Sequence, residues 1–515
     1  MAERLSARAM VGLLADDFCE IPYPERRSRP DGPLAWQGYD ASRARAAERT
    51  GEQESVICGT AHVEGARAVL IAFEFGFLGG SLGERTGDRL EAAYTYAREH
   101  RLPVVPLVAT GGSRMQEGML ALTQLQRVAR QSALTRAAGL PQIAVLRDPT
   151  TGGGWATLGA GADVILALPG AQVGFAGSRV RPPDADPSAY TAEAQVAAGA
   201  ADAVVRPEEL RETLGRWLRL LARPSAGAGE GAAAGRTADS APAPDRPAPE
   251  NSVPGTPGPP GAALPGTPDT SGAAHPGTPA TSGAAHPRSP DTTGAAHPVP
   301  PVEPAPVPAP LGTTDLPATG WDAVRRARSP ERPRAEAYLD AYFTERAVVS
   351  GDRCGGTDPG MLCGFGEHGG RTLAYAAQTG TATRPAGYRT ATRLIRLADR
   401  LGIPVLTLVD TPGAANDAEA ERQGAGAAIA DLFTTVASAR TPITTLLIGE
   451  GGSGGALALA APGATYATPD SYFSVIAPEP AAAILKRSPE EVEATADQLR
   501  IRPQDLVELG VVVRP

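Results

Sequence analysis

Hydrophobic residues follow two spacings in the C-terminal half of this chain. Leu394, Leu397, Ala398 and Leu401 recur at helical spacing, and a run that is apolar except for Thr407 follows at residues 404–409. The first spacing indicates an amphipathic helix, and the short run indicates a buried strand. The same order returns with a helix around 425–433 and a strand at 443–448. This half is therefore expected to alternate strands with helices.

The N-terminal half repeats this order. Its pattern predicts a helix at 90–98, a strand at 104–108, a helix at 115–134 and a strand at 143–146. Units in which a strand, a turn and a helix follow one another fit a spiral of parallel strands better than a meander. We therefore predict an α/β fold in each half.

Glycine-rich blocks occur twice, at a constant offset of 301 residues. Residues 102–105 match 403–406, Gly111 and Gly112 match Pro412 and Gly413, and Gly153 and Gly154 match Gly454 and Gly455. No gap is needed to align these blocks. The chain is therefore expected to contain two copies of one fold unit.

The glycines lie where predicted strands turn into helices. Glycine permits positive φ there and lets a ligand approach backbone N–H groups at the positive end of a helix dipole. Two such turns can direct two N–H donors at one oxyanion, and loss of one donor costs about 3 to 4 kcal/mol in known enzymes. The alternative is that these glycines serve only tight turns and close packing.

The composition changes after Arg223, where nearly a hundred residues are mostly Ala, Gly, Pro, Ser and Thr. This segment cannot form a core, so we predict domains at 1–223 and 323–515 and a disordered linker at 224–322. An eleven-residue unit runs three times within it, from Pro265, Pro276 and Pro287. Its histidines, His275, His286 and His297, are not expected to form a fixed metal site on a mobile tether.

Charge and cysteine content exclude several classes of protein. A net charge of −9 gives no reason to expect binding to nucleic acid or to an anionic membrane. Cys19, Cys58, Cys354 and Cys363 form no C-x-x-C pair, so neither zinc nor a disulfide framework is expected. The chain shows no signal peptide and no long apolar span. We expect a soluble cytoplasmic protein.

Several motifs resemble the two carboxyltransferase subunits of bacterial acetyl-CoA carboxylase. The first half carries the motifs of the β subunit: GGSLG from Gly79, TGGSRMQEG from Thr110, DPTTGG from Asp148 and GFAGSRV from Gly174. The second half carries those of the α subunit: PAGYR from Pro385, DTPGA from Asp410, AERQG from Ala420 and IGEGGSGGALA from Ile448. The chain resembles a fused β–α carboxyltransferase.

The resemblance implies a crotonase-type, ClpP-like ββα spiral in each half. It also implies transfer of carboxylate from carboxybiotin, held in trans on a biotin carrier protein, to acetyl-CoA, giving malonyl-CoA for fatty acid synthesis. Two oxyanions would form, the thioester enolate and the ureido oxygen of biotin, and each half would supply one oxyanion hole. Biotin's own nitrogen could take the α-proton, so no side-chain base is required.

The family resemblance also assigns candidate residues. The enolate hole falls on Gly111, Gly112 and Gly153, and the biotin hole falls on Gly413, Gly454 and Gly455. Arg85, Arg114 and Arg179 are candidates for binding CoA. The implied partners are the biotin carboxyl carrier protein and biotin carboxylase. A homodimer equivalent to α2β2 is implied, with halves of different protomers facing each other.

Some features depart from the family or leave alternatives open. The four-cysteine zinc ribbon of many β subunits is absent, and the long tether is no part of the family core. Gly451–Gly455 matches G-x-S-x-G, but an acyl-serine hydrolase needs a base, and His368 is the only histidine in the second half. A hydratase would need glutamates near the glycines. A malonyl or methylmalonyl thioester decarboxylase and a carboxyltransferase for propionyl-CoA stay open, as does a non-enzymatic scaffold.

Overall fold

The computed structural model describes residues 4–24, 26, 29–221 and 302–513. The three eleven-residue repeats and most of the expected linker lie outside these ranges. Both folded halves belong to one structural unit. Each half is built on its own mixed β-sheet, which confirms the predicted α/β fold.

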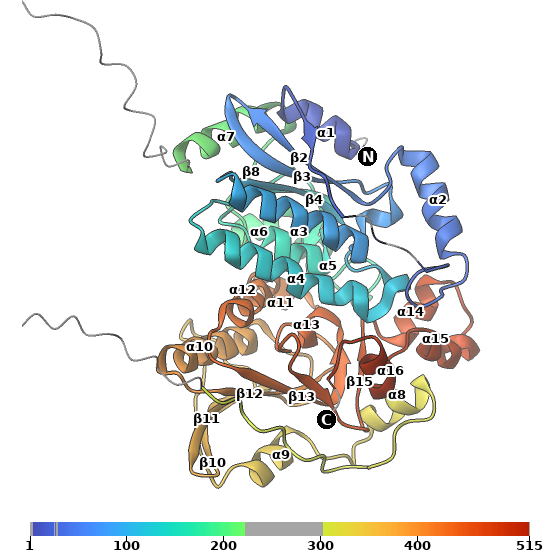
Figure 1. The fold of residues 1–515 in the computed structure, drawn as a ribbon, viewed down its shortest axis with the longest axis vertical. Helices are drawn as coiled ribbons and strands as arrows, with labels where there is room; N and C mark the ends of the chain where they lie inside the picture. Colours follow the sequence, from blue (N-terminus) through green and yellow to red (C-terminus); the bar gives the residue numbers. More distant parts are fainter. Residues whose placement is uncertain (1–3, 25, 27–28, 222–301, 514–515) are drawn as a thin grey trace, which may run out of the picture. The chain divides into compact units, whose positions relative to one another are not determined.

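The first half forms a sheet with the order β1-β2-β3-β4-β5-β6-β8, and β7 pairs with β5. Its strands are β1 (Cys19–Glu20), β2 (Val56–Val63), β3 (Ala66–Phe73), β4 (Val104–Thr110), β5 (Ile143–Thr151), β6 (Val164–Ala167), β7 (Val173–Gly174) and β8 (Ala203–Val204). Its helices are α1 (Ala7–Leu14), α2 (Tyr39–Thr50), α3 (Glu84–Glu99), α4 (Gly118–Ala137), α5 (Gly152–Gly154), α6 (Ala192–Ala197) and α7 (Pro207–Leu221). Figure 1 shows α3 and α4 side by side, and they pack against each other.

The second half forms a sheet with the order β14-β13-β12-β11-β10-β9, and β15 pairs with β13. Its strands are β9 (Glu345–Val348), β10 (Met361–His368), β11 (Arg371–Gln378), β12 (Val405–Thr411), β13 (Ile443–Gly452), β14 (Thr465–Ala467) and β15 (Tyr472–Ser474). Its helices are α8 (Gly320–Arg328), α9 (Ala335–Tyr342), α10 (Pro385–Leu401), α11 (Ala418–Arg422), α12 (Ala425–Ser438), α13 (Ser453–Leu457), α14 (Pro478–Ile484), α15 (Val492–Gln498) and α16 (Pro503–Glu508).

The central strands are parallel, as predicted, because α3 and α10 each carry the chain back between neighbouring strands. Each sheet also contains an antiparallel hairpin, which the sequence analysis did not predict. Both hairpins turn through two residues with positive φ, Glu64–Gly65 and Gly369–Gly370, which is the backbone of a tight two-residue turn. Every residue of β4 and β12 is buried, because side chains pack on both faces of each sheet.

The internal repeat extends to the hydrogen bonds of the backbone. In β4 and β5, Thr110 pairs with Thr150 after a break in register, and in β12 and β13, Thr411 pairs with Gly451 after the same break. The N–H of Val104 donates to Pro141 O, and that of Val405 donates to Pro442 O, both at 3.0 Å. The two halves are therefore copies of one unit in their geometry as well as in their sequence.

The two halves contact each other through helices that follow equivalent strands. Helix α4 packs against α12 and α13. Gly426 in α12 lies against the buried indole of Trp155, where a Cβ would overlap the ring. The side-chain amide of Gln126 donates to the backbone oxygens of Leu457, at 3.4 Å, and Ala460, at 2.8 Å. These contacts bring the glycine turns of both halves to one interface.

Part of the segment that was assigned to the linker, residues 302–319, packs on the second half in the structure. Ala305 is buried against the outer face of the second sheet, and its backbone oxygen accepts from Thr444 Oγ1 at 2.8 Å. Thr313 N donates to Asp470 Oδ2 at 2.7 Å. The Pro-rich composition of 302–319 suggested a linker, but an extended segment can pack on a sheet formed elsewhere in the chain.

Candidate functional site

The first glycine site joins the turn after β4 to the start of α5. A Cβ on Gly152 would lie 3.2 Å from Gly112 Cα, so the two turns touch. Gly112 and Gly152 have φ of 107° and 64°, a conformation that favours glycine. Among the described residues, no group accepts the N–H of Ser113 or of Gly153. This site thus presents two backbone donors from neighbouring turns.

The second glycine site repeats this arrangement around α13. A Cβ on Gly455 would overlap Ala414 N and lie 2.7 Å from the Tyr388 hydroxyl. Ser453 occupies the position of Gly152 and also has positive φ, 52°. Within the described ranges, the N–H groups of Ala414 and Gly454 have no acceptor. Each half therefore contains two unbonded backbone N–H groups on adjoining turns, and we call each such pair a backbone cradle.

Three predicted donors are already bonded within the protein. The N–H of Gly112 donates to Thr110 Oγ1 at 3.0 Å, and that of Gly413 donates to Thr411 Oγ1 at 3.1 Å. The N–H of Gly111 donates to Gly79 O at 2.9 Å. The unbonded donors are instead one residue further on, at Ser113 and Ala414. Neither residue was among the predicted donors, although their place directly after the glycine turn was a usable signal.

The two glycine sites share neighbours inside this single chain. A Cβ on Gly454 would lie 3.5 Å from the ring of Phe175 and 3.7 Å from Leu125, and a Cβ on Gly153 would also meet Leu125. Leu125 lies in α4 and is buried. The structure therefore brings Gly153 and Gly454 of one protomer to a common hydrophobic wall.

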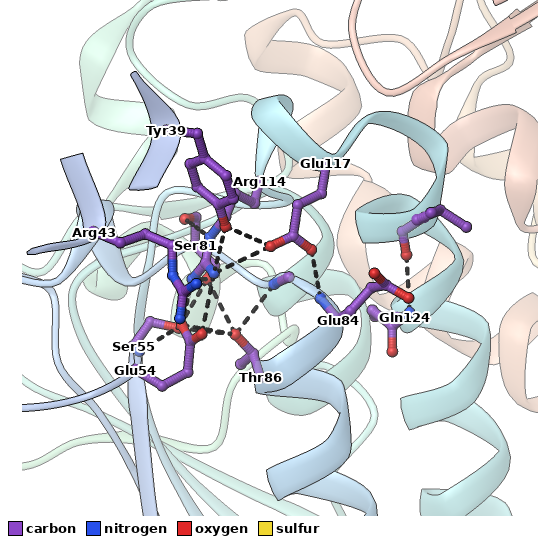
Figure 2. Close-up of polar contacts among 12 residues, drawn as sticks. Tyr39, Arg43, Glu54, Ser55, Ser81, Glu84, Thr86, Arg114, Glu117 and Gln124 are labelled. Carbon is purple, nitrogen blue, oxygen red and sulfur yellow. Dashed lines mark hydrogen bonds and ion pairs between the residues drawn. The ribbon is translucent and has the colours of Figure 1, made fainter. Parts of the chain in front are cut away.

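Arg114 occupies a buried ion-pair network and is 1% exposed. Figure 2 shows its guanidinium between Tyr39, Glu54, Ser81 and Glu117. It donates to Glu54 Oε1 at 2.5 Å and to Ser81 O at 2.7 Å. Burial alone would raise the pKa of the Glu54 carboxyl, but Arg114 lowers it to about 2.

The network does not leave Arg114 available to a CoA phosphate, which corrects that prediction. Its guanidinium forms ion pairs with the buried carboxylates of Glu54 and Glu117, and its side chain is almost completely shielded from solvent. Because Arg114 follows Ser113 directly, it instead anchors the turn that presents the Ser113 donor. Leu82 strengthens this anchor, since its backbone bonds both Gly112 O, at 2.9 Å, and Arg114 N, at 2.7 Å.

The other two candidate arginines are more accessible. Arg85, in the first turn of α3, lines a pocket of about 250 Å³ and forms no ion pair with any described residue. The pocket's other basic residues are Arg26, Arg29 and Arg43. Arg179 is exposed in the segment that follows β7. An unpaired cation in a pocket is a suitable phosphate ligand, so Arg85 fits the prediction better than Arg114 does.

Glu421 links the two halves and was not predicted as a functional residue. It lies in α11, is 1% exposed, and its Oε1 accepts the N–H of Phe175 at 2.6 Å and of Ala176 at 3.1 Å. Burial raises the pKa of its carboxyl to about 7, although these two N–H groups act in the opposite direction. The motif around Ala420 gave no sign of this contact, because its partners are more than 240 residues away.

The raised pKa of Glu421 predicts how its replacement changes stability with pH. Between its ordinary pKa of 4.5 and about 7, the folded protein holds a proton that the unfolded chain releases, so stability falls as pH rises. The full penalty, up to about 3 kcal/mol, applies above pH 7. Glu421→Gln should therefore raise the melting temperature relative to wild type at about pH 8 and lose that advantage near pH 4.5. Melting curves across this range test it, and a constant difference would contradict it.

Other chemistries lack the groups they need in the described part of the chain. No cluster of three or more His, Cys, Asp or Glu residues is placed to hold a metal there. Ser453 lies at a sharp turn, but the only histidine of the second half, His368, bonds Tyr342 O and stacks on the Tyr342 ring. Burial raises the pKa of the Cys58 and Cys363 thiols to about 12, so neither is a ready nucleophile.

No helix in the described ranges combines the length and the apolar character that a membrane crossing requires.

Comparison with known families covers both halves. Residues 35–200 match the family described as "Carboxyl transferase domain", and residues 316–514 match "Acetyl co-enzyme A carboxylase carboxyltransferase-like". The two matches fall on the halves that carried the β-like and α-like motifs. They agree with the order of the subunits inferred from sequence.

Curated relatives resemble nearly the whole chain. The "Acetyl-coenzyme A carboxylase carboxyl transferase subunits beta/alpha" of Salinispora arenicola is 35% identical and aligns with 99% of this chain and 81% of its own length. The protein of the same name from Saccharopolyspora erythraea is 33% identical over 95% and 77%. A "Probable biotin-dependent acyl-coenzyme A carboxylase beta3 subunit" of Mycobacterium bovis is 31% identical over 93% and 83%.

A solved structure of transcarboxylase 12S aligns with 99% of this chain and 86% of its own, at 17% identity and a TM-score of 0.36. The sequence relatives and the matches in both halves show which family this is. The chain belongs to the acetyl-coenzyme A carboxylase carboxyltransferases, a family of biotin-dependent carboxylases, in the form that joins the β and α subunits in one polypeptide.

Proposed function

We propose that this carboxyltransferase moves the carboxylate of carboxybiotin, held on a separate biotin carrier protein, to acetyl-CoA and so forms malonyl-CoA. The supporting observation is the pair of equivalent backbone cradles, each with unbonded N–H donors. Carboxyl transfer develops negative charge on two oxygens, one on each reactant. Fixed N–H groups stabilise such charge without reorganising during the reaction.

The first half is assigned to the CoA thioester. In this proposal Ser113 and Gly153 donate to the enolate oxygen, while Gly111 and Gly112 shape the turn that carries Ser113. Thr110 Oγ1 fixes that turn through its bond from Gly112 N. Arg85 and Arg179 remain the candidates for the CoA phosphates, since neither is paired with a described carboxylate.

The second half is assigned to biotin, and its residues fit that group. Ala414 and Gly454 offer unbonded N–H groups, and the absence of a Cβ on Gly455 lets the Ala414 turn pack directly against α13. A neutral ureido ring needs hydrogen-bond donors to its oxygen, and the two N–H groups meet that need. Carboxybiotin would supply the carboxylate, and the role of these residues is to hold the ring and orient its oxygen.

The proposed reaction requires other proteins and involves a particular oligomer. The biotin group requires a carrier protein and a biotin carboxylase that recharges it. A homodimer equivalent to α2β2, in which facing halves come from different protomers, stays a prediction. The contact between Gly153 and Gly454 through Leu125 is compatible with a site that one protomer completes by itself.

The reverse half-reaction tests the function. Purified protein is mixed with malonyl-CoA and biocytin, and acetyl-CoA is measured. We expect acetyl-CoA to form only when biocytin is present, because the carboxylate needs the ureido nitrogen as acceptor.

Formation of acetyl-CoA at the same rate without biocytin would contradict the proposal and indicate a thioester decarboxylase. Turnover of methylmalonyl-CoA but not of malonyl-CoA would overturn the acetyl-CoA assignment and favour propionyl-CoA as the acceptor. A reaction without protein gives the background rate.

A further inference from the structure

We propose that Glu421 is a positioning residue for carboxyl transfer, which fixes Phe175 so that the first turns of α5 and α13 keep their relative placement. This inference rests on the proposed function, because those turns carry the proposed oxyanion donors. Glu421 itself touches no proposed reactant. It acts through the backbone of a residue in the other half of the chain.

Glu421, in the second half, is hydrogen-bonded to the backbone of the first half. Glu421 Oε1 accepts two consecutive N–H groups, from Phe175 and Ala176, directly after β7. A Cβ on Gly174 would lie 3.2 Å from Oε1, so a glycine there lets the carboxylate approach the backbone. A carboxylate that accepts two N–H groups makes stronger bonds than a neutral acceptor would.

Phe175 lies between the start of α5 and the start of α13. Its backbone oxygen accepts the N–H of Gly152 at 3.2 Å, and Gly152 is the residue that opens α5. Its ring lies beside Gly454 in α13, 3.5 Å from where a Cβ would be. Phe175 therefore contacts the start of both helices that carry proposed donors. Any movement of Phe175 changes one site relative to the other.

Few polar side chains surround the Glu421 carboxyl. The side chains that face it, Arg181, Gln195 and Tyr190, all come from the first half. Arg181 already donates through Nε to Ala176 O at 2.9 Å and lies over the Tyr190 ring. No described residue donates a hydrogen bond to Glu421 Oε2. The two backbone N–H groups are thus its main partners, and their strength depends on the ionisation of Glu421.

The consequence for the reaction is a pH dependence of kcat. Protonation of Glu421 removes the charge that strengthens both N–H bonds, so Phe175 is held less firmly. Turnover should fall as pH drops through the neutral range, while KM for the CoA substrate should change little, because the phosphate contact assigned to Arg85 does not involve Phe175. A glutamine retains the acceptor oxygen at this position but cannot titrate.

Three variants of the full chain separate this role from a general structural one. Glu421→Ala removes the acceptor, Glu421→Gln keeps it, and Glu419→Ala removes an exposed carboxylate on the same helix as a matched control. The values of kcat and KM for malonyl-CoA are measured with biocytin from about pH 6 to about pH 9. Melting curves confirm that each variant is folded.

We expect Glu421→Ala to lower kcat by about 10²-fold, the loss typical of a small misplacement, with KM changed less than about threefold. Glu421→Gln should keep wild-type kcat within about fivefold at alkaline pH and lose the fall at acid pH. Glu419→Ala should match wild type throughout.

Wild-type kcat in Glu421→Ala would overturn the inference, and so would an acid fall in kcat that persists in Glu421→Gln. If Glu421→Ala does not fold, the pH profile of Glu421→Gln decides alone. An inactive wild type would instead reject the proposed function, which distinguishes the two failures.

Discussion

Replacement of Gly455 by alanine is expected to lower kcat for carboxyl transfer by about 10²- to 10³-fold, which is the usual loss when an oxyanion donor is displaced. The added Cβ would overlap Ala414 N and lie 2.7 Å from the Tyr388 hydroxyl and 3.0 Å from Gly413 C. Two of these atoms are backbone, so they cannot move aside as a flexible side chain would. The turn that presents Ala414 N–H must therefore shift.

Two further glycines provide controls for this prediction. A Cβ on Gly454 would lie at ordinary contact distance from Phe175 and Leu125, so Gly454→Ala should lose much less activity. Gly12, inside α1, has no atom within 4 Å of an added Cβ, and Gly12→Ala should leave turnover unchanged. Stopped assays with malonyl-CoA and biocytin give kcat for each. Wild-type turnover in Gly455→Ala would mean that this cradle is not used.

Replacement of Arg114 by methionine is expected to destabilise the protein by about 3 to 5 kcal/mol, the range for breaking a buried ion pair by removal of one partner. The carboxylate of Glu54, which is 1% exposed, would lose its ion-pair partner and keep only the weaker attraction of Arg43. Tyr39 and Ser81 would also lose a hydrogen-bond partner. The midpoint of urea unfolding measures the loss.

The ionisation of Glu54 gives this prediction a pH dependence. In wild type its pKa lies near 2 instead of 4.5, so its contribution is present above pH 4.5 and is lost as pH falls towards 2. The deficit of Arg114→Met should shrink in acid, where Glu54 is protonated, and in the double variant Glu54→Gln, Arg114→Met. Arg206→Met, at an exposed pair, should change stability by less than about 0.5 kcal/mol. An unchanged midpoint for Arg114→Met would contradict this account.

Local patterns were sufficient to predict much of the fold. The apolar run at 404–409 corresponds to β12, and the helical spacing of Leu394 and Leu401 falls within α10. The constant offset between the glycine blocks predicted two copies of one unit, and the equal registers of β4 with β5 and of β12 with β13 confirm this. Periodicity and repeats are properties of the sequence itself, so no contact was needed to find them.

Some element limits required more than local pattern. Helix α3 begins at Glu84, six residues before the predicted start, because Thr86 bonds Gly83 N and caps its first turn. The segment at 302–319 looked like part of the linker until its contacts with the second sheet were known. In both cases the limit of the folded segment depends on a contact that the hydrophobic periodicity does not reveal: a capping side chain for α3 and the surface of the second sheet for residues 302–319.

The amino-acid sequence alone determined the strand and helix order, the duplication, the glycine turns and the family to which their motifs point. Tertiary structure decided which N–H groups are left unbonded, since Gly79 O, from an earlier turn of the chain, accepts the N–H of Gly111. It also placed Arg114 in a buried network and Glu421 against Phe175. The availability of a donor or a charge depends on which groups from distant segments contact it, and only the folded chain brings those groups together.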